Sequence, residues 1–236
     1  MTTDFTYVGT ELDLFARATN WKAYLRRQVT PYLGRDVLEV GAGFGATTLR
    51  LCSGGHDRWL CLEPDPALAR RLEASISAGE LPPCCQTQVK TVHDLACEQA
   101  FDTLLYIDVL EHIRDDASEV DRAMHLLRPG GHVVALSPAH QLLYTPFDAA
   151  IGHHRRYSKK TIAALTPPGL RLVRLRYLDA VGMLASLGNR LILNQSMPTS
   201  KQVALWDGIM VRLSRLIDPV TAYSLGKSVL AVWKKS

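Results

Sequence analysis

Apolar and polar positions follow a regular order between residues 35 and 137. Short apolar runs are followed by longer stretches in which apolar residues recur every three or four positions, which are the patterns of strands and amphipathic helices. The run Phe101–Ile107 is largely apolar, as expected of a strand covered on both faces. Strands are predicted at 37–40, 59–63, about 84–89, 101–107 and 132–136. The alternation predicts an α/β domain with a doubly wound parallel sheet.

The segments on either side of this region carry helical patterns. Residues 1–34 predict helices, with apolar faces formed by Leu12, Phe15 and Ala16, then by Trp21, Tyr24, Leu25 and Val29. Farther along, Leu170–Leu178 and Val229–Trp233 predict two more strands. Between these strands, at about 180–227, two apolar stripes predict an inserted helical pair: Val181, Leu184, Ala185, Leu191 and Ile192, then Val203, Trp206, Ile209, Met210, Leu213 and Leu216.

The first strand runs into a glycine-rich turn, and a helix is predicted over 46–53. Gly41, Gly43 and Gly45 stand at alternate positions, two residues beyond Glu39. A strand, a glycine turn and a helix N-terminus form a nucleotide-type binding site. The spacing Gly41-x-Gly43-x-x-Ala46 also satisfies the dinucleotide pattern, so the loop alone leaves NAD open. Glu39 favours a cationic amino-acid headgroup, because a carboxylate would repel a pyrophosphate.

The second strand also ends in a carboxylate. Glu63 lies twenty residues beyond Gly43, and Asp65-Pro66 follows as the N-cap and first residue of the next helix. A carboxylate at this place accepts hydrogen bonds from both ribose hydroxyls in NAD sites. We therefore predict that Glu63 binds a ribose.

Three further motifs lie at the end of the fourth strand and beyond it. Asp108-Val-Leu-Glu-His112 ends it, Asp116-Ala-Ser-Glu119 is predicted as a capping box, and Arg128-Pro-Gly-Gly131 precedes the fifth strand. Together with Glu39–Gly45, these segments resemble class I S-adenosylmethionine (SAM)-dependent methyltransferases of the small-molecule type related to the ubiquinone O-methyltransferases. The resemblance implies a Rossmann-like seven-stranded sheet with strand seven antiparallel, SAM as cofactor and S-adenosylhomocysteine (SAH) as product.

The resemblance also implies roles for individual residues and segments. Helices in 1–34 would lie across the cofactor mouth, residues 35–137 would form the SAM-binding core, and 138–236 would supply the substrate side. The insertion would cap the acceptor pocket; the alternatives are a homodimer interface or plain surface without a function. The cofactor-binding residues would be Glu39, Gly41, Gly43, Glu63, Val92, His93 and Asp108, with Val92 and His93 against adenine.

Residues 138–160 form a long segment without a clear helical or strand pattern, and such segments are usually functional. His153 or His154 could take a proton from an acceptor hydroxyl or amine, and Asp148 could orient it. We select His153 as the base and Asp148 as its partner.

The same segment continues with basic residues. Arg155 and Arg156 could hold a carboxylate or phosphate, and Tyr157 is placed with them as substrate-binding. In the alternative interpretation, Ser158 caps a helix Lys159–Leu165 and the arginines pair with acids of the protein body.

Composition limits the remaining possibilities. The 236 residues suffice for a single α/β domain, and a net charge of +4 does not indicate nucleic-acid binding. The polar N-terminus and the absence of an apolar run of about eighteen residues predict a cytoplasmic protein without a membrane span. Five cysteines without a Cys-x-x-Cys motif predict neither a disulfide framework nor a metal site.

The sequence thus predicts methyl transfer from SAM to an oxygen or nitrogen of a small, anionic and partly apolar metabolite, such as a natural product or an envelope precursor. Two alternatives remain open. One is a SAM-consuming enzyme that acts by intramolecular displacement without methyl transfer, and the other is a nucleotide-dependent oxidoreductase using the same glycine loop.

Overall fold

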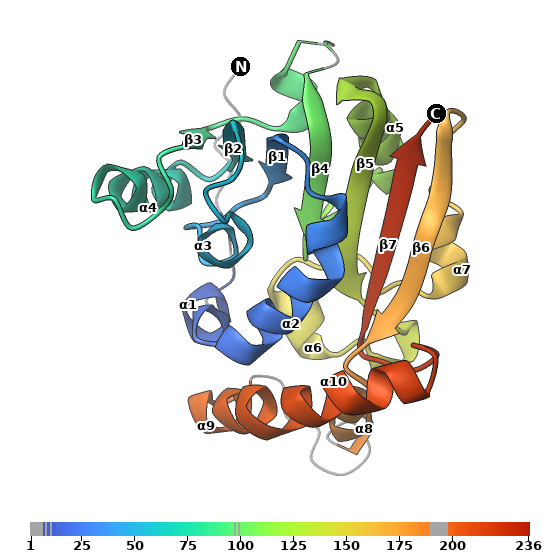
Figure 1. The fold of residues 1–236 in the computed structure, drawn as a ribbon. Coiled ribbons are helices and arrows are strands. Elements are labelled where there is room, and N and C mark those ends of the chain that lie inside the picture. The colour runs from blue at the N-terminus through green and yellow to red at the C-terminus, as the bar shows by residue number, and fades with distance from the viewer. Residues whose placement is uncertain (1–6, 8, 10, 97, 99, 189–197) are drawn as a thin grey trace.

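A computed structural model describes residues 7, 9, 11–96, 98, 100–188 and 198–236. Its centre is a seven-stranded sheet in the order β3-β2-β1-β4-β5-β7-β6 (Figure 1). Strand β7 is antiparallel to both its neighbours and the other pairs are parallel, which confirms the predicted doubly wound sheet. The strands are β1 Asp36–Val40, β2 Arg58–Leu62, β3 Cys85–Gln88, β4 Phe101–Ile107, β5 Leu127–Pro138, β6 Leu170–Leu178 and β7 Ser228–Lys235.

Both faces of the sheet are covered by apolar side chains. Val37 and Leu38 are adjacent and wholly buried, yet they belong to different hydrophobic clusters, because successive side chains of a strand point to opposite faces. The helices of this region are α3 Thr48–Leu51, α4 Pro66–Ser77 and α5 Asp116–Leu126. Two buried layers explain why the central strands are so apolar.

Local signals placed most helix starts correctly. The Asp65 carboxylate accepts hydrogen bonds from the amides of Ala67 and Leu68 at 2.6 and 3.1 Å, so it caps α4 as predicted. The capping box at Asp116 is wrong by one residue, because Asp115 caps α5 by accepting from the Ser118 amide. The helix predicted over 46–53 is only the four-residue α3, because the glycine turn extends to residue 47.

The N-terminal helices and the insertion between β6 and β7 lie at the carboxyl ends of the parallel strands (Figure 1). The N-terminal pair is α1 Glu11–Ala16 and α2 Thr19–Val29, as the pattern of residues 1–34 predicted. The insertion comprises α8 Ala180–Gly188, α9 Ser200–Leu205, a π-helical turn Trp206–Met210 and α10 Val211–Val220 (Figure 1). The predicted stripe positions Leu191 and Ile192 lie outside the described residues.

Two buried aspartates fasten the insertion to the sheet. Asp179 follows β6 at φ +68° and accepts hydrogen bonds from Gly182 N, Trp206 Nε1 and Ser214 Oγ at 3.0, 2.7 and 2.6 Å. Asp218 on α10 accepts from the amide of Asp179 at 2.7 Å. One turn of backbone at the end of β6 therefore holds α8, the π-turn and α10 together.

The segment 138–160, expected to lack regular structure, contains a 3₁₀ turn Gln141–Leu143 and the short helix α6 Pro146–Ala150. Ser158 caps the following helix α7 Lys159–Ala163 by accepting from the Thr161 amide at 3.1 Å, as predicted, and α7 ends two residues early. Within the described part of the chain, no helix is long and apolar enough to cross a membrane.

Candidate functional site

A cavity of about 1010 Å³ lies where the carboxyl ends of β1, β2 and β4 meet the N-terminal helices and the insertion. Its walls come from the glycine loop, α1, α2, the segment around α6, and the insertion. Ligands of open α/β sheets bind at the carboxyl ends of the strands, where the strand order reverses. The topology therefore marks this cavity as the candidate site.

The glycine loop requires glycine for two different reasons. Gly41, Gly43 and Gly45 all have positive φ, at +65°, +57° and +88°. A Cβ on Gly41 would lie 2.7 Å from Val109 Cγ2, and one on Gly45 would lie 2.5 Å from Leu72 Cδ1. Gly41 and Gly43 line the cavity, so a ligand there meets bare backbone.

Glu63 is held rigidly beside this loop. It is 5% exposed, and its two oxygens accept hydrogen bonds from the amides of Gly43 and Asp65 at 2.7 and 2.9 Å. Burial raises the pKa of its carboxyl. Glu63 also lines the cavity, and its contact with a ribose stays a prediction.

Glu39 is buried deeper than expected. One of its oxygens accepts hydrogen bonds from Thr48 Oγ1 and Trp59 Nε1 at 2.8 and 2.7 Å. Burial raises the pKa of this carboxyl to about 7. Glu39 lines the cavity and also ties β1 to α3 and β2, and its contact with a cationic headgroup stays a prediction.

Of the two residues predicted to face adenine, the structure brings one to the cavity. His93 lines it and is half-exposed, with Nε2 3.0 Å from Glu119 Oε2. Val92 is wholly buried in the cluster that contains Val120 of α5, and it is not part of the cavity wall. The turn that Thr91 caps directs the Val92 side chain into the core, and a contact of Val92 with adenine stays a prediction.

Asp108 ends β4 with an unusual backbone at φ +55°. Its side chain is exposed to the cavity, but the surrounding protein removes water and raises the pKa of the carboxyl to about 6. His153, Lys227 and Lys22 oppose this rise electrostatically. Among the described residues no side chain donates a hydrogen bond to Asp108, so its carboxylate is available to a ligand.

His153 and Asp148 form the pair that the sequence suggested. His153 Nδ1 lies 3.0 Å from Asp148 Oδ1, and both residues are buried at the cavity wall. Asp148 also accepts two hydrogen bonds from the Arg156 guanidinium and two from Thr145. These bonds hold the pKa of Asp148 far below its usual range. His154 is exposed and lies outside the cavity.

Glu111, His112 and His153 form a second cluster at the cavity wall, with ligand atoms within 4.8 Å of one another. This set could hold a divalent cation, although the sequence predicted no metal site. Burial raises the pKa of Glu111 well above its usual range and lowers that of His112 to about 4. The sequence analysis quoted the motif that contains Glu111 and His112 but assigned only Asp108 from it.

The structure brings only one of the three residues predicted to bind the substrate, Arg156, to the cavity. Arg155 bonds Asp116 at 2.6 Å and lies outside the cavity. Tyr157 is 2% exposed, and its hydroxyl donates to the same Asp116 oxygen at 2.6 Å. The cause is the capping of α5: since Asp115 serves as the N-cap, Asp116 is free to bind both residues. Arg156 does line the cavity, but it donates twice to Asp148.

Two lysines of the cavity wall, Lys22 and Lys227, also escaped the sequence analysis. Lys22 on α2 is buried, and its ammonium donates to the carbonyls of Phe15 and Ala16, while burial lowers its pKa to about 8. Lys227 places its ammonium 3.8 Å from the centre of the Trp206 ring. The sequence could have indicated Lys22, because this lysine stands beside the apolar stripe of α2. It could not have indicated the contact of Lys227 with Trp206, because the tertiary fold alone brings these two residues together.

Comparison with known proteins identifies the domain. Residues 38–133, which contain the glycine loop, Glu63 and Asp108, match the family model described as a methyltransferase domain. Residues 38–133 form a class I SAM-dependent methyltransferase domain. Its cofactor is therefore SAM, as the resemblance implied.

Curated relatives of the methyltransferase domain act on different substrates. The ubiquinone biosynthesis O-methyltransferase of Xylella fastidiosa is 33% identical over 113 residues, which are 47% of this chain and 44% of that protein. The tRNA U34 carboxymethyltransferase of Hahella chejuensis is 28% identical over 131 residues, 55% of this chain and 40% of that protein. The chain thus spans about half the length of the curated relatives it matches.

Solved methyltransferase structures share the fold over most of the chain. Coclaurine N-methyltransferase, bound to N-methylheliamine and SAH, superposes with a TM-score of 0.63 and 15% identity. The match covers 98% of this chain and 76% of that one. The fold therefore extends beyond the matched domain model to the N-terminal helices and the last strands.

Proposed function

We propose that this methyltransferase domain transfers the methyl group of SAM to an oxygen or nitrogen of a small, partly apolar molecule that carries an anionic group. The observation that supports this most directly is that one cavity contains both the glycine loop and the Asp148–His153 pair. Its volume of about 1010 Å³ is at the upper end of the range for small-molecule sites, which leaves room for two ligands. The proposal includes the division into an N-terminal lid (1–34), a SAM-binding core (35–137) and a substrate side (138–236).

The residues on the core side of the cavity fit SAM. Gly41 and Gly43 offer bare backbone, Glu63 would bind the ribose, and Glu39 and Asp108 supply negative charge that suits a cationic ligand. His93 would lie near adenine. SAM supplies a methyl group that is already electrophilic, so the protein has mainly to align the acceptor with it.

His153 is the base in this proposal. Asp148 remains ionised at neutral pH and can only accept, so the hydrogen of the ring lies on Nδ1 and points at Asp148. His153 Nε2, which lies 3.8 Å from Glu111 Oε1, is then the ring atom that can accept a proton. A hydroxyl acceptor would lose its proton there, whereas an amine could react without a base.

The remaining residues of the cavity wall indicate the kind of acceptor that would fit. Trp206, Val203 and Phe147 contribute apolar surface. Lys227 and Arg156 contribute positive charge, which their ion pairs with Asp179 and Asp148 compensate in part. Helices α1 and α2 and the insertion enclose this space, which favours a small molecule over a nucleic acid. Whether the insertion also forms a dimer interface is a separate prediction.

The test is a metabolite screen with isotopically labelled methyl-SAM. The wild type, His153→Ala and the matched control His154→Ala are each incubated with a pool of small phenols and amines that carry carboxylate or phosphate groups. We expect one labelled product and stoichiometric SAH from the wild type and His154→Ala, and a rate about 10² to 10⁴ lower from His153→Ala for a hydroxyl acceptor. For an amine acceptor, His153→Ala should lose much less activity.

Two results would contradict the proposal. Formation of methylthioadenosine without a labelled acceptor would indicate SAM consumption without methyl transfer. Equal losses in His153→Ala and His154→Ala, with intact SAH binding, would remove the base role from His153.

A further inference from the structure

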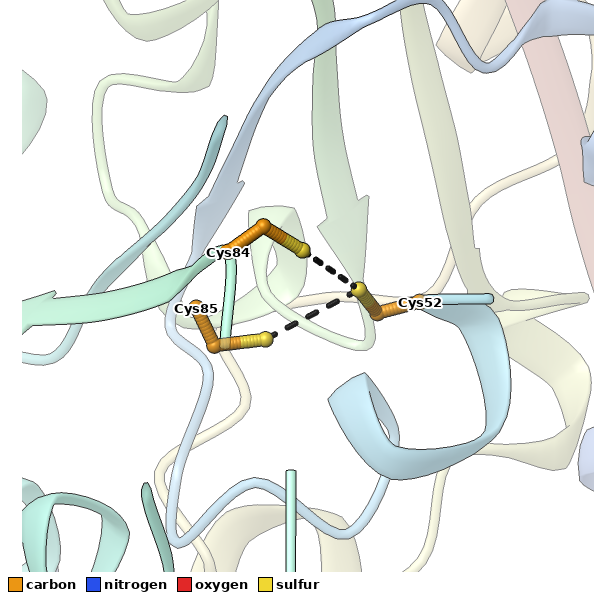
Figure 2. A group of neighbouring side chains, drawn as sticks. All are labelled: Cys52, Cys84 and Cys85. Carbon is orange, nitrogen blue, oxygen red and sulfur yellow. Dashed lines mark hydrogen bonds between the residues drawn. The ribbon is translucent and has the colours of Figure 1, made fainter. Parts of the chain in front are cut away.

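Three cysteines converge at the end of α3, outside the cavity wall. Cys52 directly follows α3, and Cys84 and Cys85 stand at the start of β3, so the chain brings together residues more than thirty positions apart. The Cys52 sulfur lies 3.5 Å from that of Cys84 and 3.7 Å from that of Cys85 (Figure 2). All three sulfurs lie within 4.8 Å of one another, and none of the three residues lines the cavity.

The spacing of the sulfurs suits a shared metal ion. Zinc–thiolate bonds are about 2.3 Å long, so two thiolates on one tetrahedral ion stand about 3.8 Å apart and two on a trigonal ion about 4.0 Å apart. The observed 3.5 and 3.7 Å differ from these values by a few tenths of an ångström. A disulfide would require one pair to approach to about 2.05 Å and would leave the third sulfur unused.

The three thiols already contact one another. The Cys85 thiol donates a hydrogen bond to the Cys52 sulfur, and a second hydrogen bond joins Cys52 and Cys84. A metal ion would replace the protons of these thiols, which leave to solvent as it binds. Cys52 and Cys85 are buried, whereas Cys84 is partly exposed and gives access from the surface.

We propose that Cys52, Cys84 and Cys85 bind one thiophilic d¹⁰ cation, Zn²⁺ or Cu⁺, which fastens the end of α3 to the start of β3. Three thiolates satisfy Cu⁺ directly, while Zn²⁺ would add a water as its fourth ligand. The sequence could not predict this site, because its ligands do not form a local Cys-x-x-Cys motif and Cys52 joins the others only through the sheet.

The experiment uses the full chain, reduced and stripped of metal under anaerobic conditions. It is loaded separately with Zn²⁺ and with Cu⁺, desalted, and assayed for metal per chain, for thiols that remain reactive and for the midpoint of thermal unfolding. We expect one ion per chain, protection of three of the five cysteines and a higher unfolding temperature. The ion with the tighter competition constant against a chelator is the one the site selects.

Variants assign the site to these residues. Cys52→Ser and Cys84→Ser should each weaken binding at least about 100-fold, since each removes a direct ligand. Cys84 is the most exposed of the three, so Cys84→Ser should fold even if Cys52→Ser does not. Cys61→Ala is the matched control, because Cys61 is a buried cysteine of β2 outside the cluster, and it should retain the ion.

Three outcomes would overturn the proposal. One is that the reduced wild type binds neither ion. Another is that Cys84→Ser keeps its ion with unchanged affinity, or that Cys61→Ala loses it to the same degree. The last is a Cys52–Cys84 disulfide in the isolated protein whose reduction yields no metal-binding form, which would make the cluster a redox pair.

Discussion

Replacement of Asp148 by Asn removes the charge on which the base site depends. Asp148 is 1% exposed and accepts five hydrogen bonds: His153 Nδ1 and Arg156 Nε bond Oδ1, and Arg156 Nη2 with the amide and hydroxyl of Thr145 bond Oδ2. Asparagine keeps one acceptor oxygen, so at least two of the five donors lose their partner in either orientation of the amide. Because each hydrogen bond to a charged group contributes about 1.5–3 kcal/mol, we expect Asp148→Asn to lower the free energy of unfolding by about 3–5 kcal/mol.

Urea unfolding followed by tryptophan fluorescence measures this loss, and its pH dependence tests the cause. The pKa of Asp148 is lowered in the folded state, so its stabilisation is complete above the unfolded value of about 3.9 and is lost as the pH falls toward the folded value. The difference between wild type and variant should therefore be constant from pH 8 to about 5 and should shrink below about pH 4.

Asp121→Asn is the matched control, since Asp121 is half-exposed and pairs only with His125 at 3.7 Å in the described structure. This control should change stability by less than about 0.5 kcal/mol. A loss below about 1 kcal/mol in Asp148→Asn, or a difference that grows in acid, would refute the assigned charge network.

Three other substitutions test the loop, the buried acid and the insertion. Gly45→Ala should lower the free energy of unfolding by about 2–4 kcal/mol and Gly54→Ala by only about 1–2 kcal/mol. Both glycines have positive φ, but only a Cβ at position 45 would press against Leu72. Equal losses in urea unfolding would contradict this explanation. Glu39→Gln should be more stable than wild type by up to about 3 kcal/mol at pH 8, because the raised pKa of Glu39 makes its ionisation costly above the pKa it has in the unfolded chain. This gain should vanish near pH 4, and a gain that does not depend on pH would refute the prediction. Asp179→Asn should lower stability by about 2–3 kcal/mol and expose residues 180–220 to limited proteolysis, because it leaves at least one of the donors from the insertion without an acceptor. An unchanged digestion pattern would speak against the anchoring role of Asp179.

The sheet and the glycine loop were predictable because their determinants are local. Strand periodicity, the positive φ of Gly41 and Gly43, and the Asp65 cap each depend on a few adjacent residues. The Asp148–His153 pair was also accessible, because the two residues are five positions apart in one segment.

The structure departs from the expected arrangement where a shift of one residue decides which side chain faces the cavity. A cap at Asp115 in place of Asp116 is enough to draw Arg155 and Tyr157 away from the site. Val92 and His93 are neighbours, yet only His93 reaches the cavity. Such alternatives differ by single hydrogen bonds, and the tertiary structure selects between them.

The most direct test of the account is calorimetric titration of SAH into the wild type, Glu63→Ala and Glu80→Ala. Glu63 lines the cavity, whereas Glu80 is exposed in the turn that follows α4 and is not part of the cavity wall. We predict one SAH per chain in the wild type and Glu80→Ala, and affinity at least about tenfold weaker in Glu63→Ala. Absence of SAH binding to the wild type, or equal affinity in all three proteins, would contradict the placement of SAM in this cavity.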